Sequence, residues 1–213
     1  MCLGRFEGKI VLVTASTEGI GFAIAERIAS EGGEVIISSR KEKKITEAVN
    51  QLKAKNYKVV GFACNVSKQE DRDNLFKFIQ EKYGRLDVLI PNAAASLHFG
   101  PSLDTPEKAY DKMFETNVKA VFMMVKEYMP LLLKSDKKPN ICITSSYTAY
   151  DNSTMIGIYG VTKTSLLGLT KMLAKELLFD EIRVNCVCPG LIRTKFAGAL
   201  LKDEKLALSS TGA

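Results

Sequence analysis

Short apolar runs alternate with amphipathic stretches along the whole chain. Between the runs, apolar residues recur at helical spacing, as in Ile45, Ala48, Val49 and Leu52. The runs typical of buried strands are residues 10–14, 34–39, 58–65, 86–92, 140–145 and 183–187. This alternation predicts an α/β fold with a Rossmann-like, doubly wound parallel sheet, and right-handed crossovers order its six strands 3-2-1-4-5-6.

Start signals mark several of the predicted helices. Ser67 and Glu70 have the spacing of a capping box, and Thr105 precedes a proline where a helix begins. One long helix is predicted from there, over about 106–134. Its apolar run at 120–125 is wider than one buried face needs. Either this helix is buried between the sheet and its neighbours, or it also forms a dimer interface.

Length and composition limit the possible classes of protein. At 213 residues and 46% hydrophobic, the chain fits one domain, 1–213, with a full core. Its net charge of +6 comes from lysines spread over helix faces, without aromatic stacking residues, which favours a solvated surface over a nucleic-acid site. The single histidine, His98, cannot form a cluster of nitrogen ligands, so we expect no metal site.

The ends of the chain and its cysteines bear on location. Five cysteines at irregular positions are typical of a reducing compartment. Residues 1–5 carry no apolar targeting region, no apolar run approaches 18 residues, and residues 211–213 are not a peroxisomal tripeptide. We therefore expect a soluble, intracellular, cytoplasmic protein without a membrane span.

A glycine turn at Gly19 and Gly21 falls between the first strand and a helix predicted over 22–30. Backbone N–H groups at such a helix start bind a pyrophosphate, which predicts a dinucleotide site. Ser39 and Arg40 end the second strand, where an acidic residue would bind a ribose 2′-hydroxyl and repel a 2′-phosphate. A guanidinium favours the phosphate, so NADP(H) is expected; the alternative is that Arg40 is only surface charge.

Tyr159 and Lys163 are four residues apart and share one helix face. Such a pair is common by chance, and without other signals it indicates only a packed tyrosine with a solvated lysine beside it. Ser146 changes this interpretation, because it lies 13 residues before Tyr159 and follows an apolar strand. Its hydroxyl is expected at the carboxyl end of that strand, which is the edge where open α/β sheets bind ligands. Together the three residues indicate a hydride-transfer site.

With these motifs in order, the chain resembles a short-chain dehydrogenase/reductase from about Phe6 to Phe196. The segments 14–21, 38–40 and 159–164 resemble those of the NADP-dependent retinol dehydrogenases and carbonyl reductases called family member four. The resemblance implies a homo-oligomer through the long helix near 106–134. It implies a catalytic group of Asn117, Ser146, Tyr159 and Lys163. The implied cofactor-binding residues are Thr14, Ser16, Thr17, Gly19, Ile20, Gly21, Ser39, Arg40, Asn65, Val66, Asn92, Ala93, Tyr159, Lys163, Pro189, Gly190, Ile192 and Thr194.

Three positions depart from the usual family pattern. Ala15 stands at the first glycine of the turn, and because alanine takes a positive φ only at a cost, a right-handed or extended conformation is expected there. Asn65 replaces an aspartate beside the adenine, and its carbonyl oxygen can still accept from the amino group. Ala94 replaces the glycine that usually follows Asn92 and Ala93.

The implied chemistry is reduction of a carbonyl, in which Tyr159 gives the proton and Ser146 donates to the same oxygen. A charge at about 4 Å is worth roughly 4 kcal/mol, or about three pK units, so Lys163 is expected to lower the pKa of Tyr159 toward neutrality. The resemblance also has Lys163 hold a ribose, Asn117 position a water, and Thr194 touch the nicotinamide. His98 and Phe99 either line the substrate pocket or lie on the surface.

The expected function is NADPH-dependent reduction of small apolar ketones, aldehydes, quinones or retinoids, with the reverse alcohol oxidation. The resemblance ends near residue 196, and residues 197–213 are unassigned, so the seventh strand and lid of relatives have no counterpart in this sequence. This makes the strand at 183–187 an expected sheet edge. The alternative function is a non-catalytic variant that binds a nucleotide or a partner subunit.

Overall fold

The fold was analysed in a computed structural model, which describes residues 4–152, 154–194, 196 and 198. Strands and helices alternate as predicted. The strands are β1 (Ile10–Thr14), β2 (Glu34–Ser39), β3 (Val59–Ala63), β4 (Val88–Ile90), β5 (Asn140–Thr144) and β6 (Arg183–Val187). The helices are α1 (Gly19–Ser30), α2 (Glu42–Lys53), α3 (Gln69–Tyr83), α4 (Glu107–Phe114), α5 (Ala120–Leu132) and α6 (Gly157–Glu176). Short 3-10 turns cover Ser102–Asp104 (η1) and Tyr147–Ala149 (η3), and η2 (Glu115–Lys119) is π-helical.

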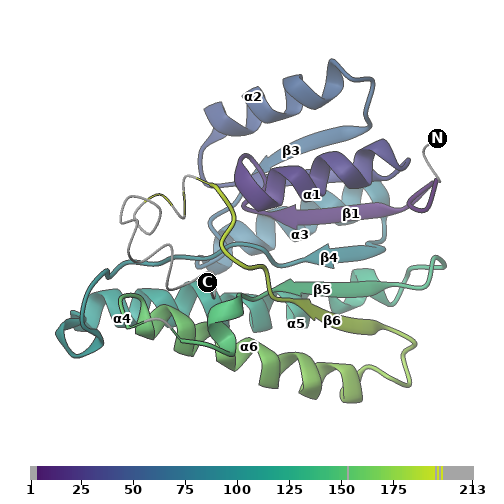
Figure 1. The fold of residues 1–213 in the computed structure, drawn as a ribbon. Coiled ribbons are helices and arrows are strands. Elements are labelled where there is room, and N and C mark those ends of the chain that lie inside the picture. Colours follow the sequence, from purple (N-terminus) through teal and green to yellow (C-terminus); the bar gives the residue numbers. More distant parts are fainter. Residues whose placement is uncertain (1–3, 153, 195, 197, 199–213) are drawn as a thin grey trace.

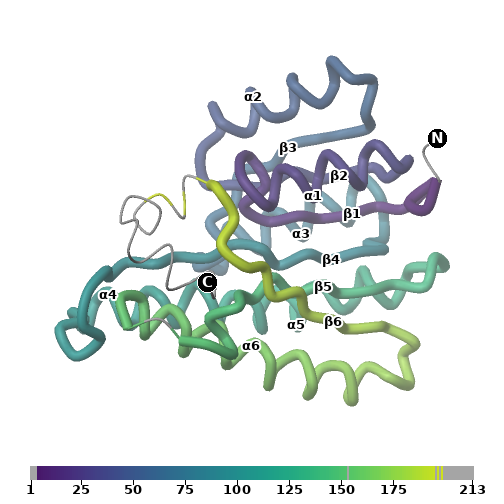
Figure 2. Tube along the Cα trace, in the orientation of Figure 1, coloured from purple at the N-terminus to yellow at the C-terminus, as the bar shows by residue number. Residues whose placement is uncertain are grey.

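The described strands form one parallel sheet in the order β3-β2-β1-β4-β5-β6, which confirms the predicted topology. In the register, Leu12 of β1 lies between Ile36 of β2 and Leu89 of β4. All carboxyl ends face the same side of the molecule, on the left in Figure 1, and the tube in Figure 2 shows each strand leading there into a loop or helix. That edge is where the predicted site residues must meet.

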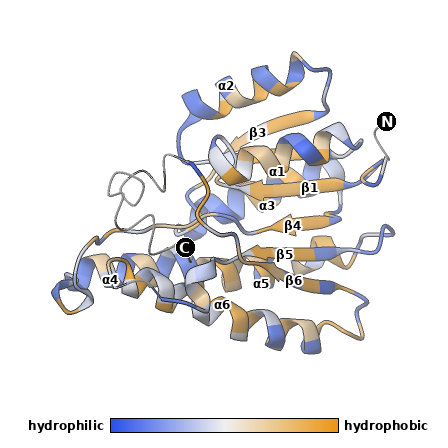
Figure 3. Cartoon of the chain, viewed as in Figure 1, coloured by the Kyte–Doolittle hydropathy of each residue, from blue (hydrophilic) through white to orange (hydrophobic). Residues whose placement is uncertain are grey.

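Alternate residues of the central strands point to opposite faces of the sheet, and each face has its own core. Leu12 and Ile36 pack with α3, α5 and α6, whereas Val11 and Val35 pack with α1 and α2. The central strands β1 and β4 are accordingly mostly apolar, as Figure 3 shows by their orange colour, whereas β5 and β6 also carry polar residues such as Asn140 and Arg183. The composition of the central strands is the one expected of a parallel sheet that is covered on both sides.

β6 is the edge strand of the described sheet, as predicted. It pairs only with β5 within the described residues, and Arg183, Asn185 and Val187 are exposed along it.

None of the described helices is long and apolar enough to cross a membrane.

The predicted long helix is not continuous α-helix. α4 and α5 are joined by the π-helical η2, in which one extra residue per turn widens the backbone, and Asn117 lies in this segment. The apolar run predicted at 120–125 contributes Ala120, Val121, Met124 and Val125 to the core, which supports the buried alternative.

Both predicted helix caps are wrong. The Ser67 hydroxyl contacts Thr116 Oγ1 at 3.0 Å instead of capping α3. The Asp71 carboxylate in the first turn of α3 accepts from Asn65 N at 2.8 Å. At α4 no side chain caps the helix start, and the Thr105 hydroxyl is buried without a hydrogen-bond partner among the described residues. The Ser67 hydroxyl is used in a tertiary contact, and the loop before α4 holds Thr105 away from the helix start. The capping motifs in the sequence therefore do not form caps.

Candidate active site

An open cleft of about 990 Å³ runs along the carboxyl edge of the sheet. It brings together residues from the glycine turn, the ends of β2, β3, β4 and β5, helix α6 and the segment after β6. The predicted site residues that line it are Thr17, Gly19, Ile20, Gly21, Ser39, Arg40, Asn65, Val66, Asn92, Ala93, Ser146, Tyr159, Lys163, Pro189, Gly190, Ile192 and Thr194. The structure thus gathers most of the prediction into one cavity.

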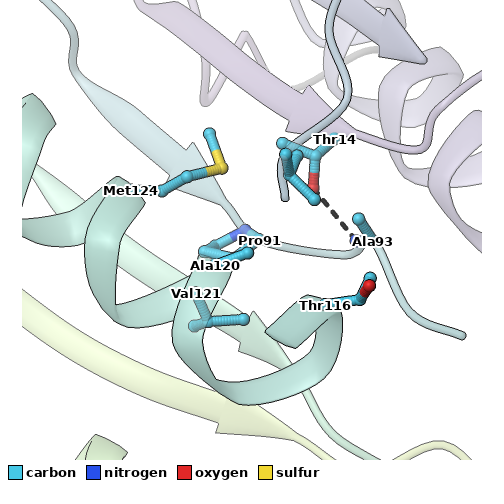
Figure 4. A pocket seen from close by; sticks show the side chains of 8 residues that line it. Thr14, Pro91, Ala93, Thr116, Ala120, Val121 and Met124 are labelled. Carbon is cyan, nitrogen blue, oxygen red and sulfur yellow. Dashed lines mark hydrogen bonds between the residues drawn. The ribbon is translucent and has the colours of Figure 1, made fainter. Parts of the chain in front are cut away.

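Thr14, Ser16 and Asn117 do not line the cleft. The Thr14 hydroxyl accepts from Asn92 N and Ala93 N at 2.9 and 3.0 Å. Figure 4 shows the bond to Ala93 beside an apolar gap that is too narrow to hold water, between the sheet edge and the start of α5. Thr14 therefore fixes the wall of the cleft from behind.

Ser16 is fully buried, and its hydroxyl has partners within the protein. It donates to Val13 O at 2.6 Å and accepts from Ser38 N at 3.0 Å, which ties the glycine turn to β2. The Ser16 hydroxyl thus builds the turn, and its place among the cofactor-binding residues stays a prediction. Thr17, which does line the cleft, keeps that role as a prediction.

The glycine turn forces a strained residue at Ala15, contrary to the prediction. Ala15 has a φ of 50°, in the left-handed region. A side chain at Gly21 would collide with the Ala15 carbonyl oxygen, and Asn92 Nδ2 donates to that same oxygen at 3.3 Å. The close approach of α1 to the turn and the bonds from Asn92 hold the conformation that alanine alone disfavours.

The start of α1 suits an anion. Gly19 has a φ of 59°, and the first turn of α1 contains no acidic residue and receives no side-chain cap from Glu18. Helix N-termini concentrate N–H donors and a positive partial charge. The backbone at this helix start therefore suits the phosphates of a dinucleotide.

At the other end of the cleft, two hydrogen bonds hold α6 against the end of β5. Lys163 Nζ donates to Thr144 O at 2.9 Å, and Ser145 Oγ donates to Lys163 O at 2.8 Å. Lys163 is only 2% exposed, and this burial lowers the pKa of its ammonium to about 8. A buried lysine with a lowered pKa beside a cleft is typical of a functional site, because such a group can lose its proton near neutral pH.

Tyr159 is buried beside Ser146 and Lys163. Burial raises the pKa of the Tyr159 phenol to about 12, and the hydrogen bond with Ser146 opposes that shift only in part. The Lys163 ammonium lies 5.5 Å from the centre of the Tyr159 ring and bonds to the Thr144 carbonyl. The predicted lowering of the pKa of Tyr159 by Lys163 is therefore wrong for this structure, because desolvation of the phenol outweighs the distant charge.

Ser146 presents its hydroxyl at the start of η3. Its Oγ accepts from Thr148 N at 3.2 Å and from Thr148 Oγ1 at 2.9 Å. These two bonds occupy the oxygen's lone pairs and leave its own proton for Tyr159 or a ligand. Thr148 thus orients a hydrogen-bond donor into the cleft.

Asn117 is completely buried in η2, and its amide is bonded to protein. Its Oδ1 accepts from Ala95 N at 2.7 Å, and its Nδ2 donates to Ala95 O and Thr162 Oγ1, each at 2.9 Å. No N–H of this side chain remains for the predicted water. The side chain instead positions the cleft loop at Ala95 against the helix that carries Tyr159.

In the loop after β3, Asn65 also uses its carbonyl oxygen internally. Oδ1 accepts from Ser67 N at 3.2 Å, within the loop after β3. Arg72 Nη1 holds the neighbouring Val66 carbonyl at 2.8 Å and pairs with Glu127 at 2.8 Å. This half of the cleft is shaped by backbone groups that charged side chains behind it hold in place.

His98 and Phe99 line the cleft, as one of the two alternatives predicted. Tyr147, Ile156, Lys112 and Phe196 also line it and were not predicted from the sequence. The Phe196 ring lies 5.7 Å from that of Tyr159. Tyr147 is next to Ser146 in the sequence, so adjacency was a usable signal. Lys112 and Phe196 have no such signal, because only the tertiary fold brings them to the site.

The fold and the cleft, with Ser146, Tyr159 and Lys163 at one end, are those of a dinucleotide-dependent oxidoreductase. The chain belongs to the short chain dehydrogenase family, whose model it matches over residues 9–205. Two relatives show which members of this family it is similar to. It is 47% identical over 202 residues to tropinone reductase-like 3 of Erythroxylum coca, covering 95% of this chain and 77% of that protein. It is 46% identical over 197 residues to dehydrogenase/reductase SDR family member 4 of Bos taurus, covering 92% and 70%. The predicted resemblance is confirmed.

Solved structures agree with the fold. The Pseudomonas aeruginosa RhlG/NADP active-site complex has a TM-score of 0.89 at 26% identity, covering 100% of this chain and 84% of that chain. A short-chain dehydrogenase from Escherichia coli CFT073 complexed with NADPH has a TM-score of 0.87 at 29% identity, covering 94% and 84%.

Proposed function

We propose that this chain is an NADPH-dependent reductase of small apolar ketones, aldehydes, quinones or retinoids, which also oxidises the corresponding alcohols. One observation carries the proposal. A buried, neutral Tyr159, hydrogen-bonded to Ser146 and beside Lys163, lies in the same cleft as a glycine turn and Arg40. A single domain is proposed for 1–213, and the continuous sheet that the described strands form supports it.

The cofactor proposed for the cleft is NADP(H). The uncapped start of α1 suits its pyrophosphate, and Arg40 stands at the end of β2, where an acid would repel a 2′-phosphate. Neighbouring structures that are described as complexes with NADP or NADPH support this choice. When bound, the cofactor supplies or accepts the hydride.

The chain's own residues handle the proton. With its pKa near 12, Tyr159 is protonated at neutral pH and can donate to a carbonyl oxygen that gains negative charge. Ser146 donates a second hydrogen bond to the same oxygen. Lys163, whose pKa is near 8, is mostly charged at pH 7 and places a positive charge beside the ring of Tyr159.

The substrate end of the cleft is mainly apolar. Leu97, Phe99, Ile156 and Phe196 line it around Tyr159. Such walls favour an apolar substrate. The identity of the substrate within that class is the part of the proposal that activity measurements decide.

The test is turnover of the purified chain with NADPH and with NADH against a panel of ketones, aldehydes and quinones. We expect NADPH consumption that depends on the carbonyl compound, and slower consumption of NADH. Binding of NADPH without turnover of any compound would instead select the alternative, a non-catalytic nucleotide-binding variant. Absence of nucleotide binding would contradict both of these and leave only a variant that binds a partner subunit.

We also propose a homo-oligomer that uses the helices α4, α5 and α6. Tyr110, Phe122, Val161 and Met172 on these helices are each 38–43% exposed, and apolar side chains of this kind pack against a second copy. Light scattering tests this, with Phe122→Glu expected to shift the chain toward monomer. An unchanged mass for that variant would contradict the proposed surface.

A further inference from the structure

A carboxylate stands among the groups that line the nucleotide end of the cleft. Glu18 precedes Gly19 at the start of α1, and it lines the cleft together with Ser39 and Arg40. Its side chain is about half exposed, at 46%. A negative charge next to a phosphate site opposes the binding of an anion, because like charges in one cleft repel. The site therefore contains a feature that works against the proposed cofactor.

Lys44 compensates for this charge. Its Nζ lies 2.9 Å from Glu18 Oε1, and the two residues are 26 positions apart in the sequence. Lys44 is in the first turn of α2, so the pair bridges the starts of α1 and α2 across the loop that carries Ser39 and Arg40. Lys44 itself does not line the cleft.

We propose that the Glu18–Lys44 ion pair sets the preference for a 2′-phosphorylated dinucleotide. Lys44 neutralises Glu18 and holds its carboxylate toward α2, so that the positive charge of Arg40 is not offset where the 2′-phosphate would bind. A cofactor with an uncharged 2′-hydroxyl gains little from this arrangement. Lys44 is thus a positioning residue that acts through Glu18. The inference rests on the proposed use of NADP(H).

Four variants test the pair: Lys44→Ala, Glu18→Gln, the double variant and the control Lys43→Ala. Lys43 precedes Lys44 in the same helical turn and carries the same charge, whereas the ion pair with Glu18 is formed by Lys44. Dissociation constants for NADPH and NADH are measured by cofactor fluorescence at low and high salt, and thermal melting verifies that each variant is folded.

We expect Lys44→Ala to weaken NADPH binding about fivefold and NADH binding less than about twofold, as is typical of an exposed pair. Adding Glu18→Gln restores NADPH affinity, because the carboxylate charge that Lys44 offsets is removed as well. Lys43→Ala changes the NADPH to NADH ratio less than about twofold. The effect of Lys44→Ala diminishes at high salt, where exposed charges are screened.

Three results would overturn the inference: equal weakening of both cofactors by Lys44→Ala, the same loss from Lys43→Ala, or no rescue by Glu18→Gln. These are distinct from failure of the proposed function. If the wild-type chain has no preference for NADPH, the cofactor proposal fails and this inference fails with it. If the wild type prefers NADPH and Lys44→Ala leaves the ratio unchanged, only the ion-pair inference fails.

Discussion

The two ends of the cleft are built in different ways. At the nucleotide end, Arg40 and Glu18 are exposed residues on turns, and they contribute charge. At the catalytic end, Tyr159, Lys163 and Asn117 are buried, and each contacts another element of the fold. Charge at an exposed end can be changed with little effect on stability, whereas buried groups combine packing with chemistry. Affinity and turnover should therefore respond to separate sets of substitutions.

The largest effect is expected at the catalytic end. Tyr159→Phe keeps the ring and removes the proton donor, so carbonyl reduction should fall by at least about 10²-fold. Steady-state kinetics with NADPH, together with NADPH binding near the wild-type value, provide the measurement. If turnover survives in the folded variant, Tyr159 has only a packing role.

The next effect is on pH dependence. Alcohol oxidation needs the Tyr159 phenolate, and because its pKa is about 12, the base form rises about tenfold per pH unit below that value. The kcat/KM for oxidation should therefore climb from pH 6 to 8. The climb should flatten above pH 8, as Lys163, with a pKa of about 8, loses its charge. Reduction, which uses neutral Tyr159, should stay flat over pH 6 to 8. An oxidation rate that does not change over this range would contradict the assignment.

A smaller effect is expected at the nucleotide end. Arg40→Ala removes a charged hydrogen bond to a 2′-phosphate, worth about 1.5–3 kcal/mol, so NADPH should bind roughly 10- to 150-fold more weakly. NADH binding and the melting temperature should hardly change, because Arg40 is exposed. Calorimetric titration with both cofactors measures the difference. Equal losses for the two would show that Arg40 does not read the phosphate.

The smallest effect concerns the glycine turn at the nucleotide end. Ala15 has a φ of 50°, and relief of this strain by Ala15→Gly is worth about 1–2 kcal/mol, reduced by the greater freedom of glycine in the unfolded chain. A net gain of up to about 1 kcal/mol should raise the melting temperature by roughly 2–4 °C. A lower melting temperature would mean that the Ala15 methyl group makes contacts that outweigh its strain.

The sequence was sufficient to predict the strands, their order and most of the cleft. Alternating runs and right-handed crossovers leave few topologies, and the carboxyl edge of the sheet then gathers Gly19, Ser39, Ser146 and Tyr159. These predictions depend on local patterns and on one general rule of handedness.

The remaining features depend on distant partners. The Ser67 hydroxyl contacts Thr116, which no local motif indicates. The direction of the Tyr159 pKa shift depends on how deeply the phenol is buried and on Lys163 bonding to Thr144 instead. The positive φ of Ala15 follows from the close approach of Gly21.

The π-helical segment η2 also limits which changes of length this chain can tolerate. One residue advances an α-helix by about 100°, so the extra residue in η2 shifts the angular phase of α5 relative to α4. Deleting a residue here would restore regular helix and would rotate either Asn117 or Met124 out of place. We therefore expect an insertion or deletion within 115–119 to destabilise the fold more than one in a loop.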